Sequence, residues 1–179
     1  MKIIVIGVSA GGPCTLKELF SKISNIPYPV LIAQHNISEQ MECFARWLAD
    51  NIPWKVTLVK NESKLQKDTI YLPTGGKDLV IKDQYTVMAI NSSSGIAPSI
   101  DRLFESAARV FQDKSIGIIL GGLGKDGVKG AKKVIENNGI VIVQKDAKFS
   151  HLPMTVKKSI PRVKGKKLQE IILYIENLI

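Results

Sequence analysis

The chain has 179 residues, of which 45% are hydrophobic, and a formal net charge of +9. This length and composition are typical of one globular domain with a sizeable core, so we expect residues 1–179 to form a single domain. No run approaches the roughly 20 apolar residues that span a bilayer, and no signal-peptide pattern opens the chain. The sequence therefore predicts a cytoplasmic protein without membrane insertion.

The cysteines and the lysines exclude some classes of site. Cys14 and Cys43 are too few and too unpatterned for a disulfide framework or a zinc site, and we expect both to be buried. Lysines cluster at 125–133 and 157–167, which is typical of a solvated surface; a face suited to an acidic partner is the alternative. Aromatic residues make up only 6% and no nucleic-acid motif is present, so we expect no nucleic-acid partner.

The first fifty residues alternate between strands and helices. A buried strand over 2–7 precedes a helix that has Pro13 in its first turn. A second buried strand over 30–34 precedes a helix that we expect to begin at Ser38, as its N-cap, and to end near Asp50.

The middle of the chain has a different pattern. Short strands separated by turn residues are expected at 56–59, 69–72, 79–82 and 86–90. We interpret this region as an antiparallel extension of the same domain.

Alternation returns in the last eighty residues. The expected elements are a helix over 100–111, a strand over 116–120, a helix over 128–138, a strand over 140–144 and a helix over 168–175. Repeated strand–helix alternation argues for an α/β fold, a doubly wound and mostly parallel sheet with helices on both faces and an antiparallel hairpin extension.

Polar side chains follow the carboxyl ends of three predicted buried strands. Ser9 follows the first in Gly7-Val8-Ser9-Ala10-Gly11, the spelling of a nucleophile elbow. His35 follows the second, and Asp126 lies in the glycine-rich loop after the third. Ligands gather outside the carboxyl ends of parallel strands, where a serine nucleophile, a histidine base and an orienting carboxylate would suit acyl transfer.

Other interpretations of these residues stay open at this point. Ser9 could be a helix cap or a phosphate ligand, the strand-end histidine a structural residue, and Asp126 the cap of the helix that follows it. His151 competes for the role of the base, and Asp101 and Asp146 compete for the role of the acid. The order Ser–His–Asp differs from the Ser–Asp–His order of α/β-hydrolases, which disfavours an ordinary member of that class.

The chain resembles the catalytic domain of the CheB family, the chemotaxis protein-glutamate methylesterases. The matching segments are 6–12, 34–35, 98–104 and 122–127, with a weaker match at 71–75. Together they span about Ile3 to Ile160 in the family's order.

The resemblance implies site residues and an activity. It implies a triad of Ser9, His35 and Asp126, with backbone amides at Leu123 and Ala10 as donors to an oxyanion. The implied reaction is hydrolysis of glutamate γ-methyl esters on the cytoplasmic region of methylated chemoreceptors, with release of methanol. Glutamine deamidation is a further implied activity, and neither a metal nor an organic cofactor is implied.

Several residues depart from the family's pattern. Ala10 stands where Thr is frequent, Asn36 where Met is usual, and Ala97 where Arg is frequent. The first predicted strand begins at Met1-Lys2, so we expect no receiver domain within this chain.

Two other functions stay open. The first is a nucleotide-binding domain, although Gly124-Lys125 is followed by Asp126 where a P-loop has Ser or Thr, and the first turn lacks G-x-G-x-x-G. The second is a weakly active or inactive CheB-like module that binds receptors, since Ala10 and Ala97 depart from the pattern.

Overall fold

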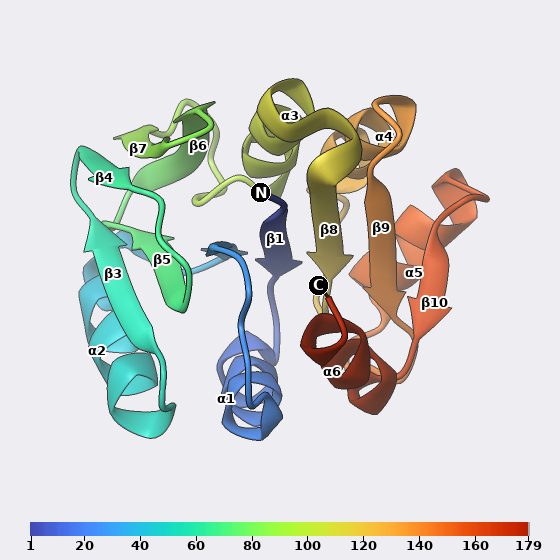
Figure 1. The fold of residues 1–179 in the computed structure, drawn as a ribbon, viewed down its shortest axis with the longest axis horizontal. Coiled ribbons are helices and arrows are strands. Elements are labelled where there is room, and N and C mark those ends of the chain that lie inside the picture. Colours follow the sequence, from blue (N-terminus) through green and yellow to red (C-terminus); the bar gives the residue numbers. More distant parts are fainter. Residues whose placement is uncertain (179) are drawn as a thin grey trace.

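The computed structural model describes residues 1–178, and the main sheet has seven strands in this part of the chain. All pairings within it are parallel. In spatial order the strands are β10 (Lys164–Lys166), β9 (Ile140–Gln144), β8 (Ser115–Ile119), β1 (Ile3–Val8), β2 (Val30–Gln34), β5 (Thr69–Pro73) and β3 (Lys55–Val59). Strands β10 and β3 therefore lie at opposite edges (Figure 1).

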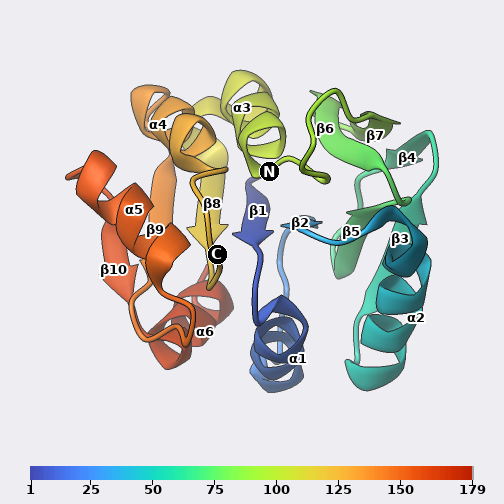
Figure 2. The same ribbon diagram turned by 180° about the vertical axis from the view of Figure 1, so that it is seen from behind.

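Helices cover both faces of the main sheet (Figures 1 and 2). The helices are α1 (Gly12–Lys22), η1 (Ser38–Gln40), α2 (Met41–Asn51), α3 (Ile100–Phe111), η2 (Gln112–Lys114), α4 (Val128–Glu136), α5 (His151–Ser159) and α6 (Leu168–Glu176). Buried residues of α1, α2 and α6 share one core layer, and those of α3, α4 and α5 share the other. Strands β1 and β2 are accordingly buried at every position. The predicted doubly wound α/β fold is confirmed.

No membrane-crossing helix is found in the part of the chain that the structure describes: none there has both the length and the apolar character required.

A small antiparallel sheet packs on the same face as α3. It consists of β4 (Glu62–Lys64), β7 (Thr86–Asn91) and β6 (Lys77–Asp83). The predicted antiparallel extension is confirmed for the strands expected at 79–82 and 86–90. It is wrong for 56–59 and 69–72, because β3 and β5 pair in parallel and complete the main sheet. Every residue of β5 is buried, as an interior parallel strand requires.

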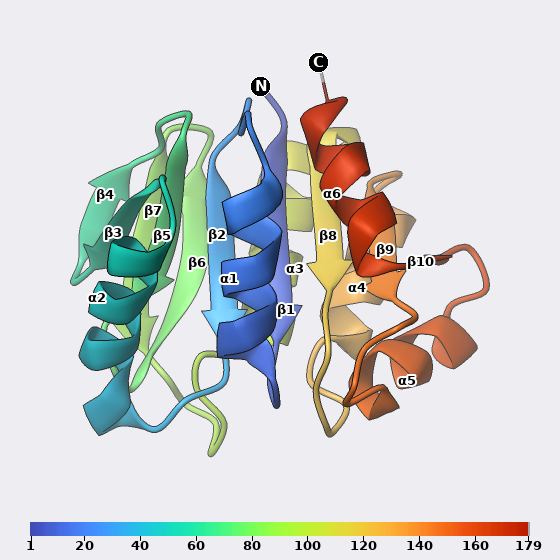
Figure 3. The ribbon, with the colours of Figure 1, turned by 90° about the horizontal axis from the view of Figure 1, so that it is seen from below.

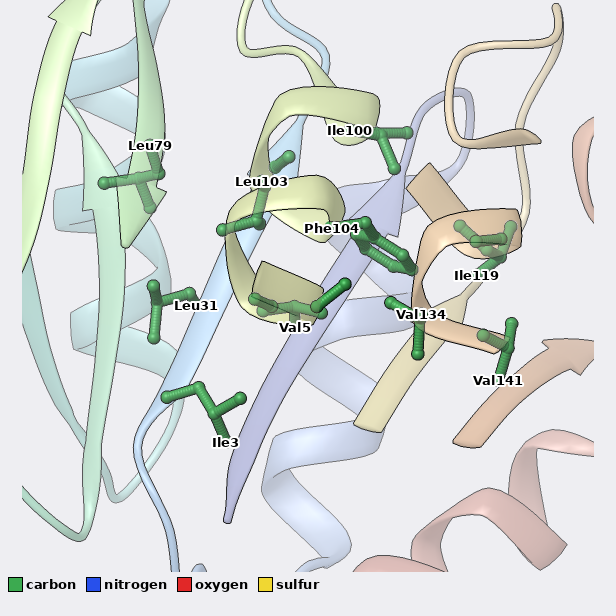
Figure 4. Close-up of a cluster of buried hydrophobic side chains, with 14 of the residues drawn as sticks. Ile3, Val5, Leu31, Leu79, Ile100, Leu103, Phe104, Ile119, Val134 and Val141 are labelled. Carbon is green, nitrogen blue, oxygen red and sulfur yellow. The ribbon is translucent and has the colours of Figure 1, made fainter. Parts of the chain in front are cut away.

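Helix α3 lies close to the sheet because a glycine of β8 makes room for it. Phe104 of α3 is fully buried, and a Cβ on Gly117 of β8 would lie 2.6 Å from its ring. Figure 4 shows Phe104 among Val5, Ile119 and Val134, between α3 and the strands. This packing fixes the position of the start of α3, where the candidate site lies.

Two local predictions are wrong. Ser38 does not cap α2, because a 3₁₀ turn begins there and Gln40 precedes the first residue of α2 without a side-chain cap. Cys14 and Cys43 are exposed rather than buried, since each lies on the side of its helix away from the apolar stripe.

Candidate active site

The parallel register brings the ends of β1, β2 and β8 to one edge of the sheet. Figure 3 shows the three strands running in the same direction. Val8 of β1 lies opposite Gln34 of β2, and the next amide, that of His35, donates to the Val8 carbonyl at 3.0 Å. On the other side the Ser9 amide donates to the carbonyl of Gly121, just after β8, at 3.0 Å. The structure therefore brings these strand ends together, as expected.

Ser9 lies on a tight turn between β1 and α1. The Ser9 carbonyl accepts the amide of Gly12, the first residue of α1, at 3.0 Å. Gly11 takes a left-handed conformation at φ 77°, which a side chain would strain. This strand–turn–helix geometry is the one expected of a nucleophile elbow.

His35 and Asp126 form a hydrogen-bonded pair. His35 Nε2 lies 2.7 Å from Asp126 Oδ2, and the two side chains are only 15% and 14% exposed. With Nε2 donating to the carboxylate, Nδ1 is the nitrogen left to accept a proton.

Ser9 and His35 line one cleft of about 740 Å³. Within residues 1–178 no hydrogen bond joins their side chains. Catalytic hydrogen bonds are often long in the absence of substrate and tighten when it binds.

Asp126 and Asp101 cap each other's helices. Asp126 accepts the amides of Ile100 (2.8 Å) and Asp101 (2.9 Å) at the start of α3. Asp101 in turn accepts the amides of Gly127 (2.9 Å) and Gly130 (2.7 Å) at the start of α4. The interpretation of Asp126 as a cap of the helix that follows it is thus wrong, because its carboxylate caps α3. We call this arrangement the crossed caps.

The pKa values of the two carboxyl groups of the crossed caps are shifted in opposite directions. Burial raises the pKa of Asp101, and the neighbouring charge of Asp126 adds to the rise, against the lowering effect of the amides of Gly130 and Gly127. Burial also acts to raise the pKa of Asp126. There the hydrogen bonds from His35 and from two backbone amides outweigh burial, so the pKa of Asp126 lies below its ordinary value. Asp126 is therefore the member of the pair whose ionised form is favoured by its surroundings.

The other candidates for base and acid have different partners. His151 begins α5, and its Nδ1 lies 3.2 Å from the Gly124 carbonyl. Asp146 accepts the amide of Leu168 at the start of α6. In the described chain neither residue has a recorded contact with His35. No group of three or more His, Cys, Asp or Glu side chains that could hold a metal ion occurs within residues 1–178.

Several backbone amides beside Ser9 have no acceptor in residues 1–178, and two of them were expected as oxyanion donors. These two belong to Ala10, which lines the cleft, and to Leu123. The segment that carries the Leu123 amide lies close to Ser9, since a Cβ added at the preceding Gly122 would lie 2.6 Å from Ser9 Cβ. Leu123 itself is 55% exposed.

The starts of α3 and α4 offer few free donors for a phosphate group. The crossed caps already occupy amides at the starts of α3 and α4. At these two helix starts the geometry therefore does not favour phosphate binding.

Gln34 is a residue of this site that the sequence did not single out. Its side-chain amide is buried and donates to the Ser9 carbonyl at 3.0 Å and the His35 carbonyl at 2.9 Å. The available signal was an amide side chain at the end of an otherwise apolar buried strand.

Comparison with known proteins gives consistent relatives. A family model described as CheB methylesterase matches residues 4–175. A protein-glutamate methylesterase/protein-glutamine glutaminase of Rhodospirillum rubrum is 35% identical over 152 residues, covering 81% of this chain and 41% of the relative. A putative protein of the same name from Leptospira interrogans is 34% identical over 144 residues, covering 79% of this chain and 75% of the relative.

A solved structure covers almost the whole chain. The crystal structure of the Thermotoga maritima CheB methylesterase catalytic domain superposes with a TM-score of 0.92 at 27% identity, covering 99% of this chain and 98% of that one. The chain spans less than half the length of several curated relatives that it matches. On the family model and these relatives together, the chain belongs to the CheB methylesterase family.

Proposed function

We propose that this chain is a serine hydrolase that removes methyl groups from glutamate γ-methyl esters on methylated chemoreceptors, with Ser9, His35 and Asp126 as its triad. The observation that carries the proposal is the 2.7 Å His35–Asp126 pair, which lies at the strand ends next to the Ser9 turn. The names of the relatives, which pair methylesterase with glutaminase, support ester hydrolysis and a second, deamidating activity on glutamine.

The first half of the reaction forms an acyl-enzyme. Ser9 Oγ attacks the ester carbonyl carbon while His35 Nδ1 takes the hydroxyl proton, and Asp126 stabilises the resulting imidazolium. The amides of Ala10 and Leu123 donate to the tetrahedral oxyanion; one such donor lowers the barrier by roughly 3–4 kcal/mol. The C–O bond to the methoxy group then breaks, and His35 returns the proton so that methanol leaves.

The second half restores the serine. His35 takes a proton from water, which attacks the acyl carbon, and the bond to Ser9 Oγ breaks as that oxygen regains a proton. The products are a glutamate carboxyl group and free enzyme. Proton transfer in both halves needs no residue beyond the triad, and the two amides act only on the oxyanion.

The surroundings of the site fit an acidic protein partner in the cytoplasm. A second cleft, of about 620 Å³, opens beside Asp126 and is lined in part by Lys125 and Lys129. The chain carries a net charge of +9, which favours approach to receptor segments rich in glutamate.

Turnover of a methylated receptor cytoplasmic fragment tests this function. We expect wild type to release methanol and Ser9→Ala to lose turnover by roughly 10⁶-fold, the loss found when a triad serine is removed elsewhere. A fluorophosphonate probe should label wild type on Ser9, as located by mass spectrometry, and should not label Ser9→Ala.

Ser21→Ala is the matched control, because Ser21 is an exposed serine on the helix that follows Ser9. Ser21→Ala should keep both methanol release and labelling by the fluorophosphonate probe. Receptor binding by wild type without turnover or labelling would contradict the proposal and favour the inactive module that binds receptors.

A further inference from the structure

Gln34 lies behind the candidate triad, at the last position of β2. Its side chain is 3% exposed, and Nε2 donates to the carbonyls of Ser9 (3.0 Å) and His35 (2.9 Å). One amide group thus contacts the main chain of both the proposed nucleophile and the proposed base.

The orientation of this amide follows from its partners. Both acceptors are carbonyl oxygens, so only the NH₂ group of Gln34 can face them. Oε1 is consequently turned away, and it has no hydrogen-bond partner within residues 1–178. An unpaired buried oxygen lowers the stability of the fold. The Gln34 amide keeps its two donated bonds in spite of that cost.

The start of α1 is shaped around the same amide. A Cβ on Gly12 would overlap Gln34 Oε1. The Gly12 amide also donates to the Ser9 carbonyl, which therefore receives one bond from the helix and one from Gln34. Glycine at position 12 is needed here because of close approach.

Gln34 extends the connection between β1 and β2 beyond the end of their ladder. The last backbone bond between the two strands in the described chain runs from the His35 amide to the Val8 carbonyl. One residue further on, Ser9 and His35 share no ladder bond there, and the Gln34 amide connects them instead.

We propose that Gln34 is a positioning residue that sets the separation of Ser9 Oγ and His35 Nδ1 by tying their backbones together. The inference rests on the proposed function, since it concerns the same two residues. Gln34 acts only through their main chain and takes no part in proton transfer.

The test is Gln34→Met, which keeps the length of the side chain and removes both donated bonds. We expect kcat for ester hydrolysis to fall about 100-fold, the scale of loss that a 1 Å misplacement causes. KM should change by less than about threefold, because both bonds are donated to backbone carbonyls of the chain itself, those of Ser9 and His35. Fluorophosphonate labelling of Ser9 should slow by a factor similar to the fall in kcat.

Gln144→Met is a matched control. Gln144 also ends a parallel strand of the main sheet, is 5% exposed and has an unpartnered Oε1, but its Nε2 donates to Asp146. We expect Gln144→Met to keep kcat within about twofold of wild type. A cost that comes only from losing a buried amide would appear equally in both variants.

Gly12→Ala is a second variant that perturbs the Gln34 amide, because a Cβ at position 12 would overlap Gln34 Oε1. The added methyl group should displace the Gln34 side chain and lower kcat, and the effects of Gly12→Ala and Gln34→Met should be less than additive. Gly12→Ala also keeps the proposal testable if Gln34→Met fails to fold.

Equal kcat values in Gln34→Met and Gln144→Met, or a rise in KM with kcat unchanged, would overturn the positioning role and leave the methylesterase proposal intact. Absence of turnover and labelling in wild type would instead overturn the proposed function, and this inference with it.

Discussion

At the scale of single residues, the carboxylate of Asp126 both accepts a hydrogen bond from His35 and caps the start of α3. Its Oδ2 accepts both from His35 and from the amide of Ile100, while Oδ1 accepts from the amide of Asp101. Each added donor favours the ionised form and fixes the direction of the carboxylate. The acid of the proposed triad is therefore anchored before any substrate arrives.

Asp126→Asn should remove both the charge that stabilises His35 and part of this anchoring, since an amide has only one acceptor oxygen. An amide cannot stabilise the imidazolium and favours the wrong tautomer of His35, so we expect kcat for methanol release to fall roughly 10⁴-fold. The measurement is steady-state turnover of the methylated receptor fragment.

His151→Gln serves as the control for this prediction. His151 is an exposed histidine whose recorded contact is with the Gly124 carbonyl, and its loss should change kcat less than twofold. A loss below tenfold in Asp126→Asn would argue against the assignment of Asp126.

The sequence predicted which side chains meet better than it predicted their support. Ser9, His35 and Asp126 follow buried strands, and a parallel sheet brings such positions to one edge. Gln34 carried no comparable signal, because the acceptors of its amide are backbone carbonyls brought near only by folding. The support that Asp101 gives to α4 was hidden for the same reason.

At the scale of elements, the crossed caps join α3 and α4 at their first turns. Each helix start has its positive end next to a carboxylate from the other segment, which is favourable to both. Movement of one helix start would remove acceptors from the other. The two helices are therefore coupled at the candidate site.

Asp101→Asn should change how stability depends on pH. The pKa of Asp101 is raised by folding, so its favourable contribution is present below the ordinary aspartate pKa of about 3.9 and is lost as pH rises through the higher folded value. Asparagine keeps an oxygen for the amides of Gly127 and Gly130 but cannot ionise. We expect the free energy of unfolding of Asp101→Asn, relative to wild type, to increase from about pH 3.9 towards neutrality.

Urea denaturation at a series of pH values measures this difference. The pKa of Asp126 is lowered, so its contribution is present above the ordinary value and is lost only as pH falls through the lower folded value, outside this window. Asp113→Asn, which removes an exposed carboxylate from η2, is the control for loss of one charge. Parallel stability curves for wild type and Asp101→Asn would contradict the prediction.

Elements with a clear apolar pattern were predictable, whereas the nine-residue helix α5 and the shortest strands were not. The strands β2 and β9 and the helix α3 match the expected ranges, because the strands are unbroken apolar runs and the helix has one apolar face. Strands β4 and β10 have three residues each, too few to show any period. Strands β3 and β5 were placed in the wrong sheet because pairing partners are set by tertiary contacts.

At the scale of the whole molecule, one sheet separates two apolar core layers. Alternate residues of β1 point into opposite layers: Ile3 and Val5 into the layer of α3, Ile4 and Ile6 into that of α1. The same strand therefore belongs to both cores. We infer from this sharing that residues 1–179 behave as a single domain.

Equilibrium unfolding in urea tests that inference. Trp54 reports on the α1 layer, where its Nε1 donates to the Phe20 carbonyl, while far-UV circular dichroism reports on all helices. With Trp47→Phe as the background, we expect the two signals to give one midpoint. Separate midpoints would show that the two layers unfold independently.

The crossed caps also bear on how such a site can change over generations. Asp126 is held by amides 26 and 25 residues earlier in the chain, at the start of α3, so its place does not depend on the side chains of its own loop. The exposed side chains of Leu123 and Lys125 are therefore open to replacement while the carboxylate stays where it is. We expect substitutions at these two exposed positions to change which target proteins bind, while Asp126 keeps its position.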